Sequence, residues 1–322
     1  MRELGQTDIK LLRALLSYGR TSFNEIAKQC RVSPDLIWKH YKDLKREGVI
    51  VGATILFNYQ KIGLNIAMIM MSVEPKNLPD VFSRLEKIPH LKESAFFRYY
   101  NSPYNVAAIA RLKNLRDLET VKQLINKNIE INEIETHLWT GVRNSPQNIL
   151  FDPTQADSES DDAAPVEQAS LDLDEVDQKI IDALHLNGRI AFKKLGAQIG
   201  VSTATVARRY ERLKASNYLK PVVQVNPLKL GFQNILEVKV ASSNQAETDR
   251  MAVLISKIPG VSYVLKISGN FDLSIVALVS DCNSIVRIND EILKVPNIKK
   301  MMATLRRLPA EWPGRSQHIS TF

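Results

Sequence analysis

The sequence predicts an α+β protein in which one two-domain unit occurs twice. Each unit is expected to be a winged helix-turn-helix domain followed by a ferredoxin-like βαββαβ domain. Three observations lead to this prediction: an internal repeat, helical spacing of apolar residues at the start of each copy, and strand-type patterns in the rest of each copy.

The internal repeat is clearest near the beginning of each copy. Residues 8–33 align with residues 177–202 at a constant offset of 169, and ten of the 26 aligned positions are identical. The match resumes at Tyr41 and Tyr210. The sequence therefore indicates a tandem duplication.

Each copy begins with three short helices. In copy 1, apolar residues recur at helical spacing from Asp8, Gly19 ends the first helix, and a second helix is expected over residues 22–29. Ser33 and Ser202 are each placed to cap a third helix. Two short helices, a tight turn and a capped third helix are typical of a helix-turn-helix.

Strand patterns follow the third helix. Connecting strands are expected over residues 49–56 and 218–225, where Pro221 is tolerated only in an edge strand. The elements expected next in copy 1 are strand 66–73, helix 78–88, strands 91–99 and 105–112, helix 115–126 and strand 131–138. Those in copy 2 are strand 236–241, helix 247–258, strands 261–268 and 271–279, helix 283–294 and strand 298–305. Several strands are apolar on both sides, so we expect each sheet to pair with a second such domain.

These elements set the predicted domain boundaries. The helix-turn-helix domains are expected at residues 1–58 and 171–226, and the ferredoxin-like domains at residues 59–143 and 227–310. Residues 144–170 are rich in Asp, Ser, Gln, Ala and Pro, and are predicted to form a flexible acidic linker. Residues 311–322 form a tail to which no pattern assigns a role.

The net charge of +8 is unevenly distributed. Residues 151–178 contain ten acidic and no basic residues, which leaves 43 basic and 25 acidic residues in the rest of the chain. A surplus of this size on folded domains attracts polyanions, so double-stranded DNA is the predicted partner. Solubility charge is the plainer alternative.

Metal, disulfide and membrane chemistry are not indicated. The two cysteines and five histidines are far apart in the sequence, and no apolar stretch approaches the roughly 20 residues of a membrane span. The start of the sequence lacks the apolar core of a signal peptide. We therefore expect a cytoplasmic protein without a cofactor or metal.

The exposed face of each third helix holds the candidate DNA-binding residues. In copy 2 this face is expected to present Thr203, Thr205, Arg208, Arg209 and Arg212. These side chains can donate to phosphate oxygens and guanine edges. Copy 1 presents Asp35, Trp38, Lys39 and Lys42 instead, and only Lys39 and Lys42 are suited to phosphate. We expect copy 1 to bind DNA more weakly or with a different sequence preference.

The chain resembles the leucine-responsive/asparagine regulator (Lrp/AsnC) family of transcription factors. The residues that carry the resemblance are Leu173–Ile181, Leu186–Arg189, Ile199–Ser202, Arg208, Arg209, Leu213 and Lys266–Asp272. The resemblance implies a sequence-specific DNA-binding regulator that responds to a small metabolite such as an amino acid. It also implies that the ferredoxin-like domains pair, either as an internal pseudo-dimer or in a homo-oligomer.

The same resemblance places effector binding near a hairpin of copy 2. It assigns Gly269, Asn270 and Asp272 to effector contact, and ordinary hairpin chemistry is the alternative explanation of these residues. Copy 1 has no glycine at this hairpin, and Asn105 replaces the acid. Effector binding is therefore expected in copy 2 only.

Two other functions remain open at this point. A branch that resembles this family, the sirohaem decarboxylases, uses the same modules, and His137, Arg98 and Lys266 are the side chains that such an enzyme could use. Helix-turn-helix domains can also bind protein, and a steep salt dependence would instead indicate phosphate binding. The sequence favours a regulator that is not an enzyme.

Overall fold

The computed structural model describes residues 4–91, 95–100, 102–150, 171–314 and 319–320. The chain divides into two compact units, and each unit contains parts of both copies. Unit 1 comprises residues 1–61, 146–231 and 309–322, and unit 2 comprises residues 62–145 and 232–308. The prediction that the flexible linker begins at residue 144 is wrong, because Asn144 belongs to a strand and Pro146–Leu150 form a 3₁₀ turn with buried side chains. From position 151 onward the predicted linker lies outside the described residues.

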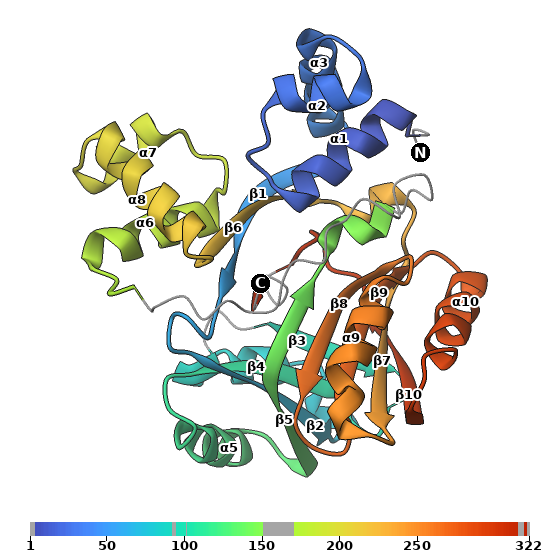
Figure 1. Cartoon of the computed structure of the whole chain (residues 1–322). Coiled ribbons are helices and arrows are strands. Elements are labelled where there is room, and N and C mark those ends of the chain that lie inside the picture. Colours follow the sequence, from blue (N-terminus) through green and yellow to red (C-terminus); the bar gives the residue numbers. More distant parts are fainter. Residues whose placement is uncertain (1–3, 92–94, 101, 151–170, 315–318, 321–322) are drawn as a thin grey trace. The chain divides into compact units, whose positions relative to one another are not determined.

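Unit 1 contains two three-helix domains and a small sheet (Figure 1). The elements of copy 1 are α1 (Gln6–Ser17), α2 (Phe23–Cys30), α3 (Pro34–Arg46) and β1 (Ile50–Asn58). Those of copy 2 are α6 (Glu175–Leu186), α7 (Phe192–Ile199), α8 (Thr203–Ala215) and β6 (Leu219–Val225). The sheet order is β11–β1–β6, with β11 at Ile319–Ser320, and β1 and β6 run antiparallel. Pro221 therefore lies in an edge strand of the described sheet, as its missing amide hydrogen requires.

Unit 2 contains the two ferredoxin-like domains, joined into one closed barrel. Copy 1 provides β2 (Asn65–Val73), α4 (Val81–Leu85), β3 (Phe96–Tyr100), β4 (Val106–Leu112), α5 (Asp117–Asn128) and β5 (Ile131–Asn144). Copy 2 provides β7 (Asn234–Ser242), α9 (Thr248–Ser256), β8 (Val261–Ile267), β9 (Leu273–Val279), α10 (Cys282–Leu293) and β10 (Ile298–Arg307). The strand order is β10–β3–β4–β2–β5–β8–β9–β7, so the pairs β3–β10 and β5–β8 join the two copies. The α+β fold class predicted from the sequence is confirmed.

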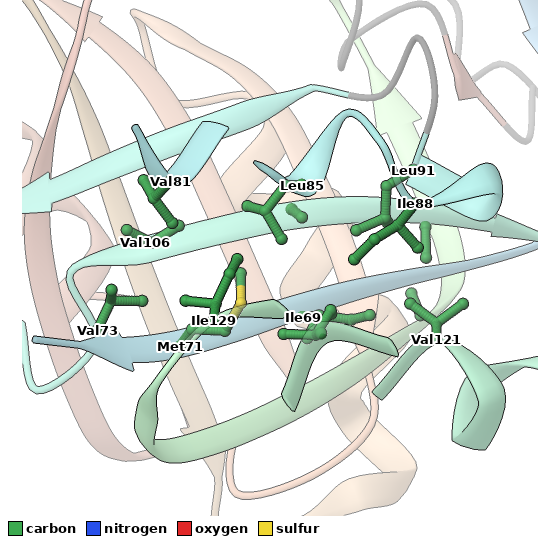
Figure 2. Packing of buried hydrophobic residues seen from close by; sticks show 14 of the residues in the cluster. Ile69, Met71, Val73, Val81, Leu85, Ile88, Leu91, Val106, Val121 and Ile129 are labelled. Carbon is green, nitrogen blue, oxygen red and sulfur yellow. The ribbon is translucent and has the colours of Figure 1, made fainter. Parts of the chain in front are cut away.

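The helices of unit 2 pack on the outer faces of these sheets. In copy 1, alternate residues of β2 such as Ile69 and Met71 contact Val121 from α5 and Leu85 from α4 in a cluster of buried side chains (Figure 2). Copy 2 has a corresponding cluster, in which residues of β7 and β9 pack against α9 and α10. The residues between these alternate positions consequently face the inside of the barrel.

Three elements differ from the sequence prediction by several residues. Strand β3 begins at Phe96 and not at residue 91, because Pro89–Leu91 form a short 3₁₀ turn. Helix α4 spans only Val81–Leu85, because Pro79 cannot lie in a helix interior and short 3₁₀ turns flank the helix, the second of which begins at Pro89. Strand β5 runs on to Asn144 instead of ending near residue 138, because its second half pairs with β8 of the other copy. Pairing between distant segments is not visible in a local pattern.

The tail following β10 returns to unit 1. Trp312 is fully buried, and its backbone exchanges hydrogen bonds of 2.8 and 2.9 Å with Val225 in β6. The side chain of Gln224 donates to the carbonyl oxygen of Pro313 at 3.1 Å. None of the helices in the described part of the chain has the length and apolar character needed to cross a membrane.

Candidate DNA interface and effector hairpin

Helix α8 is positioned by a cap and by its apolar side. The Ser202 hydroxyl accepts a hydrogen bond from the Thr205 amide at 3.0 Å, and Gly200 reverses the chain at φ 75°. Val206, Tyr210 and Leu213 are buried, which turns the opposite side of the helix outward. Thr203 and Arg208 are exposed there. Arg208 makes no ion pair with any described residue.

Arg209 and Arg212 are instead paired with carboxylates of α6. Arg209 Nη1 lies 2.6 Å from Asp174 Oδ1 and 3.0 Å from Asp177 Oδ1, and Arg212 Nη2 lies 2.5 Å from Asp177 Oδ2. The Asp177 side chain is fully buried, so it requires these cations. The hydrogen bond from Arg209, with backbone hydrogen bonds, lowers the pKa of Asp174 to about 2.

These ion pairs revise the sequence expectation for copy 2. The guanidinium groups of Arg209 and Arg212 pair with carboxylates of α6, whereas Arg208 makes no ion pair with a described residue. DNA contact by Arg209 and Arg212 stays a prediction. The Thr205 hydroxyl is likewise within 2.9 Å of the Ser202 hydroxyl at the cap. The sequence could not reveal this, because a charged helix face has the same pattern whether it pairs with carboxylates or with solvent.

Helix α3 in copy 1 presents a different surface. Ser33 caps it by accepting from the Leu36 amide at 3.3 Å. Lys39 and Lys42 are exposed as expected, and Lys42 Nζ lies 4.8 Å from the centre of the exposed Trp38 ring. This helix therefore offers two lysines and an aromatic ring in place of the arginine of α8.

The buried acid of α6 has a counterpart in α1. Asp8 corresponds to Asp177 in the repeat and is 1% exposed, and its Oδ1 lies 2.6 Å from His40 Nδ1. His40 stands at the position of Arg209. The contact between the buried acid and the third helix is thus retained in both copies with a different partner.

The two helix-turn-helix domains of unit 1 are joined by a reciprocal arginine contact. Arg20 donates to the carbonyl oxygens of Gly188 and Ile190 at 3.0 and 2.7 Å. Arg189, its equivalent in the repeat, donates to the carbonyl oxygen of Gly19. Each arginine therefore binds the backbone of the other copy.

Each arginine also stacks on aromatic rings of the other copy. The Arg20 guanidinium carbon lies 4.5 Å from the centre of the Phe192 ring, and that of Arg189 lies 5.3 Å from the Phe23 ring. The glycine before each arginine permits close approach, since a Cβ at Gly188 would lie 2.2 Å from the Thr54 carbonyl oxygen in β1. We call the contacts made by Arg20 and Arg189 the arginine clamp.

The predicted effector hairpin packs against β5 of copy 1 within unit 2. Gly269 has φ 112°, and a Cβ added there would lie 3.1 Å from His137 Nδ1, so the turn requires glycine. Asn270 is exposed, and its Nδ2 donates to Glu135 Oε1 at 3.3 Å. Gly269 and Asn270 therefore lie at the junction of the two copies.

Asp272 has a structural contact inside its own copy. Its Oδ2 accepts from the Ser242 amide at 2.7 Å, and in copy 1 Asn105 Oδ1 accepts from the equivalent Val73 amide at 2.9 Å. The replacement of acid by amide therefore preserves this hydrogen bond. Weaker effector binding by copy 1 stays a prediction, and it rests on the missing glycine more than on Asn105.

The three side chains of the enzyme alternative each have separate partners. Burial and the nearby Lys239 lower the pKa of His137, whose Nδ1 lies 2.8 Å from the Ser268 carbonyl oxygen. Arg98 donates to the Leu78 carbonyl oxygen, and Lys266 Nζ lies 2.8 Å from Asp249 Oδ1.

Comparison with known proteins places this architecture in a family. A model for the AsnC-type helix-turn-helix domain matches residues 173–214, one for winged helix-turn-helix DNA-binding domains matches residues 4–51, and one for the Lrp/AsnC ligand-binding domain matches residues 233–305. The regulatory protein AsnC of Escherichia coli (strain K12) is 30% identical over 129 residues, which cover 40% of this chain and 83% of AsnC. The chain belongs to the Lrp/AsnC family.

Other relatives in the Lrp/AsnC family are also named as regulators. The proline dehydrogenase transcriptional activator of Rhizobium radiobacter is 30% identical over 39% of this chain and 84% of its own length. The transcriptional regulator LysM of Saccharolobus solfataricus is 28% identical over 42% of this chain and 94% of its own length. One such relative thus corresponds in length to about one copy, and the family predicted from the sequence is confirmed.

A solved structure matches the whole chain in fold. The siroheme decarboxylase NirDL superposes with a TM-score of 0.63 over 97% of this chain and 96% of its own, at 11% sequence identity. At this identity the likeness concerns the fold alone. The fold of the whole tandem chain is therefore also found in NirDL.

Proposed function

We propose that this Lrp/AsnC protein is a sequence-specific transcriptional regulator of the cytoplasm that binds double-stranded DNA through its two helix-turn-helix domains. The observation that carries the proposal is the capped helix α8, which turns Arg208 and Thr203 outward from a buried apolar side. A guanidinium on such a helix can bind guanine in a major groove or a phosphate oxygen. Thr205 is proposed to support this contact through the cap it shares with Ser202.

Copy 1 is proposed to make the weaker contact. Lys39 and Lys42 of α3 are suited to phosphate, and neither presents the planar donor pair that reads guanine. The arginine clamp supports simultaneous binding, because it holds the two domains of unit 1 to one another. We infer that α8 supplies most of the sequence specificity and α3 mainly adds affinity.

A mobility-shift titration tests the assignment of Arg208. Replacing Arg208 with Ala is expected to weaken DNA binding by about 1–3 kcal/mol, which is about 5- to 150-fold. Arg116→Ala is the matched control, because it removes another exposed arginine, which lies in the ferredoxin-like domain of copy 1. Equal affinities of the Arg208→Ala variant and the parent protein would refute the assignment, and a log–log salt slope near zero would refute phosphate binding altogether.

We further propose that a small metabolite, such as an amino acid, regulates the protein at the hairpin of copy 2. The match of residues 233–305 to the Lrp/AsnC ligand-binding domain supports this, as do the exposed Gly269 and Asn270 at the junction of the copies. Asp272 is proposed to shape the hairpin through its hydrogen bond to the Ser242 amide. A thermal-shift screen of the twenty amino acids tests it, since an effector should raise the Tm of the parent and raise that of Asn270→Ala less.

We also propose that the chain is not an enzyme and that it forms homo-oligomers beyond its internal pairing. Val286 and Leu293, which are 57% and 55% exposed on α10, support further assembly. The fold shared with NirDL makes sirohaem decarboxylation the competing function. A Soret band on adding sirohaem, followed by loss of carboxyl groups from the macrocycle, would establish that function instead.

A further inference from the structure

The inside of the barrel in unit 2 contains charged side chains where an apolar core is expected. Glu237, Lys239 and Arg306 are 0%, 2% and 3% exposed. Arg306 Nε lies 2.9 Å from Glu237 Oε2, which also accepts from the Tyr99 hydroxyl at 2.8 Å. Burial of charge is costly unless each group is partnered, so these contacts constrain which surfaces can meet here. We call the facing inner surfaces of the two sheets, which include Met68, Met70, His137, Glu237, Lys239 and Arg306, the seam.

The ammonium group of Lys239 contacts side chains of copy 1. Its Nζ lies 2.7 Å from the sulfur of Met70 and 3.3 Å from His137 Nε2. Glu135, whose Oε1 lies 3.5 Å from His137 Nε2, adds a negative charge nearby. Copy 1 therefore offers Lys239 a polarisable sulfur, an imidazole nitrogen and a carboxylate.

Met70 and Lys239 occupy equivalent positions in the two copies. They are separated by 169 residues, the offset of the sequence repeat, and they face matching neighbours in the two sheets. Met70 pairs with Ala107 in β4, as Lys239 pairs with Ser274 in β9. When equivalent residues of two copies touch, their contact lies at the pseudo-twofold axis.

A contact at the axis distinguishes like pairing, of copy 2 with a second copy 2 domain, from unlike pairing, of copy 2 with copy 1. If a second copy 2 domain replaced copy 1, Lys239 would face another Lys239 at the axis. The strand register shows what else would change: Met302 would stand in place of Glu135, and Thr304 in place of His137. Like pairing of copy 2 would thus bury two ammonium groups together and replace Glu135 with methionine. The second domain would also bring its own Glu237 to the position of Met68, but that carboxylate is already paired with Arg306 of its own copy.

We propose that Met70 and Lys239 determine the pairing specificity of the seam, so that the ferredoxin-like domain of copy 2 binds a copy 1 domain and rejects a second copy 2 domain. The partner is thereby defined chemically as a sheet with methionine at the axis and a carboxylate beside it. The inference concerns assembly and holds whether or not the protein binds DNA. It gives a physical reason for the difference between the two copies at this one position of the repeat.

Exchange of the two side chains in the full-length protein tests this proposal. Met70→Lys alone puts a second ammonium group at the axis and should lower the Tm by roughly 10 °C. The double variant Met70→Lys/Lys239→Met restores one lysine facing one methionine, and should recover at least half of that loss. If Met70→Lys yields no folded protein, recovery of a folded double variant is the corresponding expected result.

Met68→Lys is the matched control. It introduces the same charge on the same strand and face, at a position equivalent to Glu237 instead of Lys239. Lys239→Met should therefore not rescue Met68→Lys. The proposal is overturned if Met70→Lys melts like the parent, if the double variant melts no higher than Met70→Lys, or if Lys239→Met rescues both lysine variants equally.

Discussion

Removal of one arm of the arginine clamp should loosen the two helix-turn-helix domains from one another. Arg20 makes two hydrogen bonds from a charged donor, each worth about 1.5 kcal/mol, and one close cation–π contact worth about 0.5 kcal/mol. These contributions sum to about 3.5 kcal/mol. Because the side chain is only partly buried, water replaces some of them in the variant, and we expect Arg20→Ala to cost about 2 kcal/mol.

Hydrogen exchange of backbone amides measures this loss locally. The Gly188 amide donates to the Ala53 carbonyl oxygen at 2.9 Å, and this bond opens when the domains separate. A loss of 2 kcal/mol corresponds to roughly 30-fold faster exchange in a peptide that covers residues 187–190. Arg46→Ala is the control, because that side chain is 73% exposed and should change protection by less than about twofold.

The same variant should lose discrimination between DNA sites of different spacing. The parent should prefer one distance between two half-sites, since the clamp fixes its two domains, whereas Arg20→Ala should bind several spacings alike. Exchange within threefold of the parent, together with an unchanged spacing preference, would show that the clamp does not hold the domains.

Two further predictions concern unit 1. Gly188→Ala should destabilise it strongly, because the new Cβ would lie 2.2 Å from the backbone of β1. Gly141→Ala in unit 2 is the control, because the atom nearest to its new Cβ lies at 3.3 Å and belongs to a flexible lysine side chain. Thermal melts of both variants test this contrast. Asp174 has a pKa of about 2, below its ordinary value of 3.8, so its ion pair with Arg209 stabilises the fold above about pH 4 and loses that effect as the pH falls through 2. In Arg209→Ala the carboxyl resonance of Asp174 should titrate at clearly higher pH, and an unchanged midpoint in an NMR titration would contradict the assigned cause.

The helices and most strands could be predicted from the sequence because their signals are local. The caps at Ser33 and Ser202 and the apolar sides of α3 and α8 follow directly from residue spacing. The duplication strengthened each prediction, since the same pattern had to fit twice. The extension of β5 was missed because it depends on a strand more than a hundred residues away.

The candidate site was only partly predictable. The outward position of Arg208 follows from helical periodicity, whereas the pairing of Arg209 with Asp174 and Asp177 depends on how α6 packs against α8. Asp174 is the N-cap of α6 and Asp177 lies in its first turn, so in the sequence both look like ordinary capping residues. Lys239 was missed for a similar reason, because a lysine in a strand normally indicates a solvent-facing position.

The interlocking of the two halves through Gly19, Arg20, Gly188 and Arg189 has an evolutionary consequence. A substitution in the connecting strand of one copy alters the surface against which the helix-turn-helix domain of the other copy packs. The duplicated segments can therefore drift apart in what they recognise, while their shared scaffold must change in concert. We therefore expect related genes to retain both copies or to lose both.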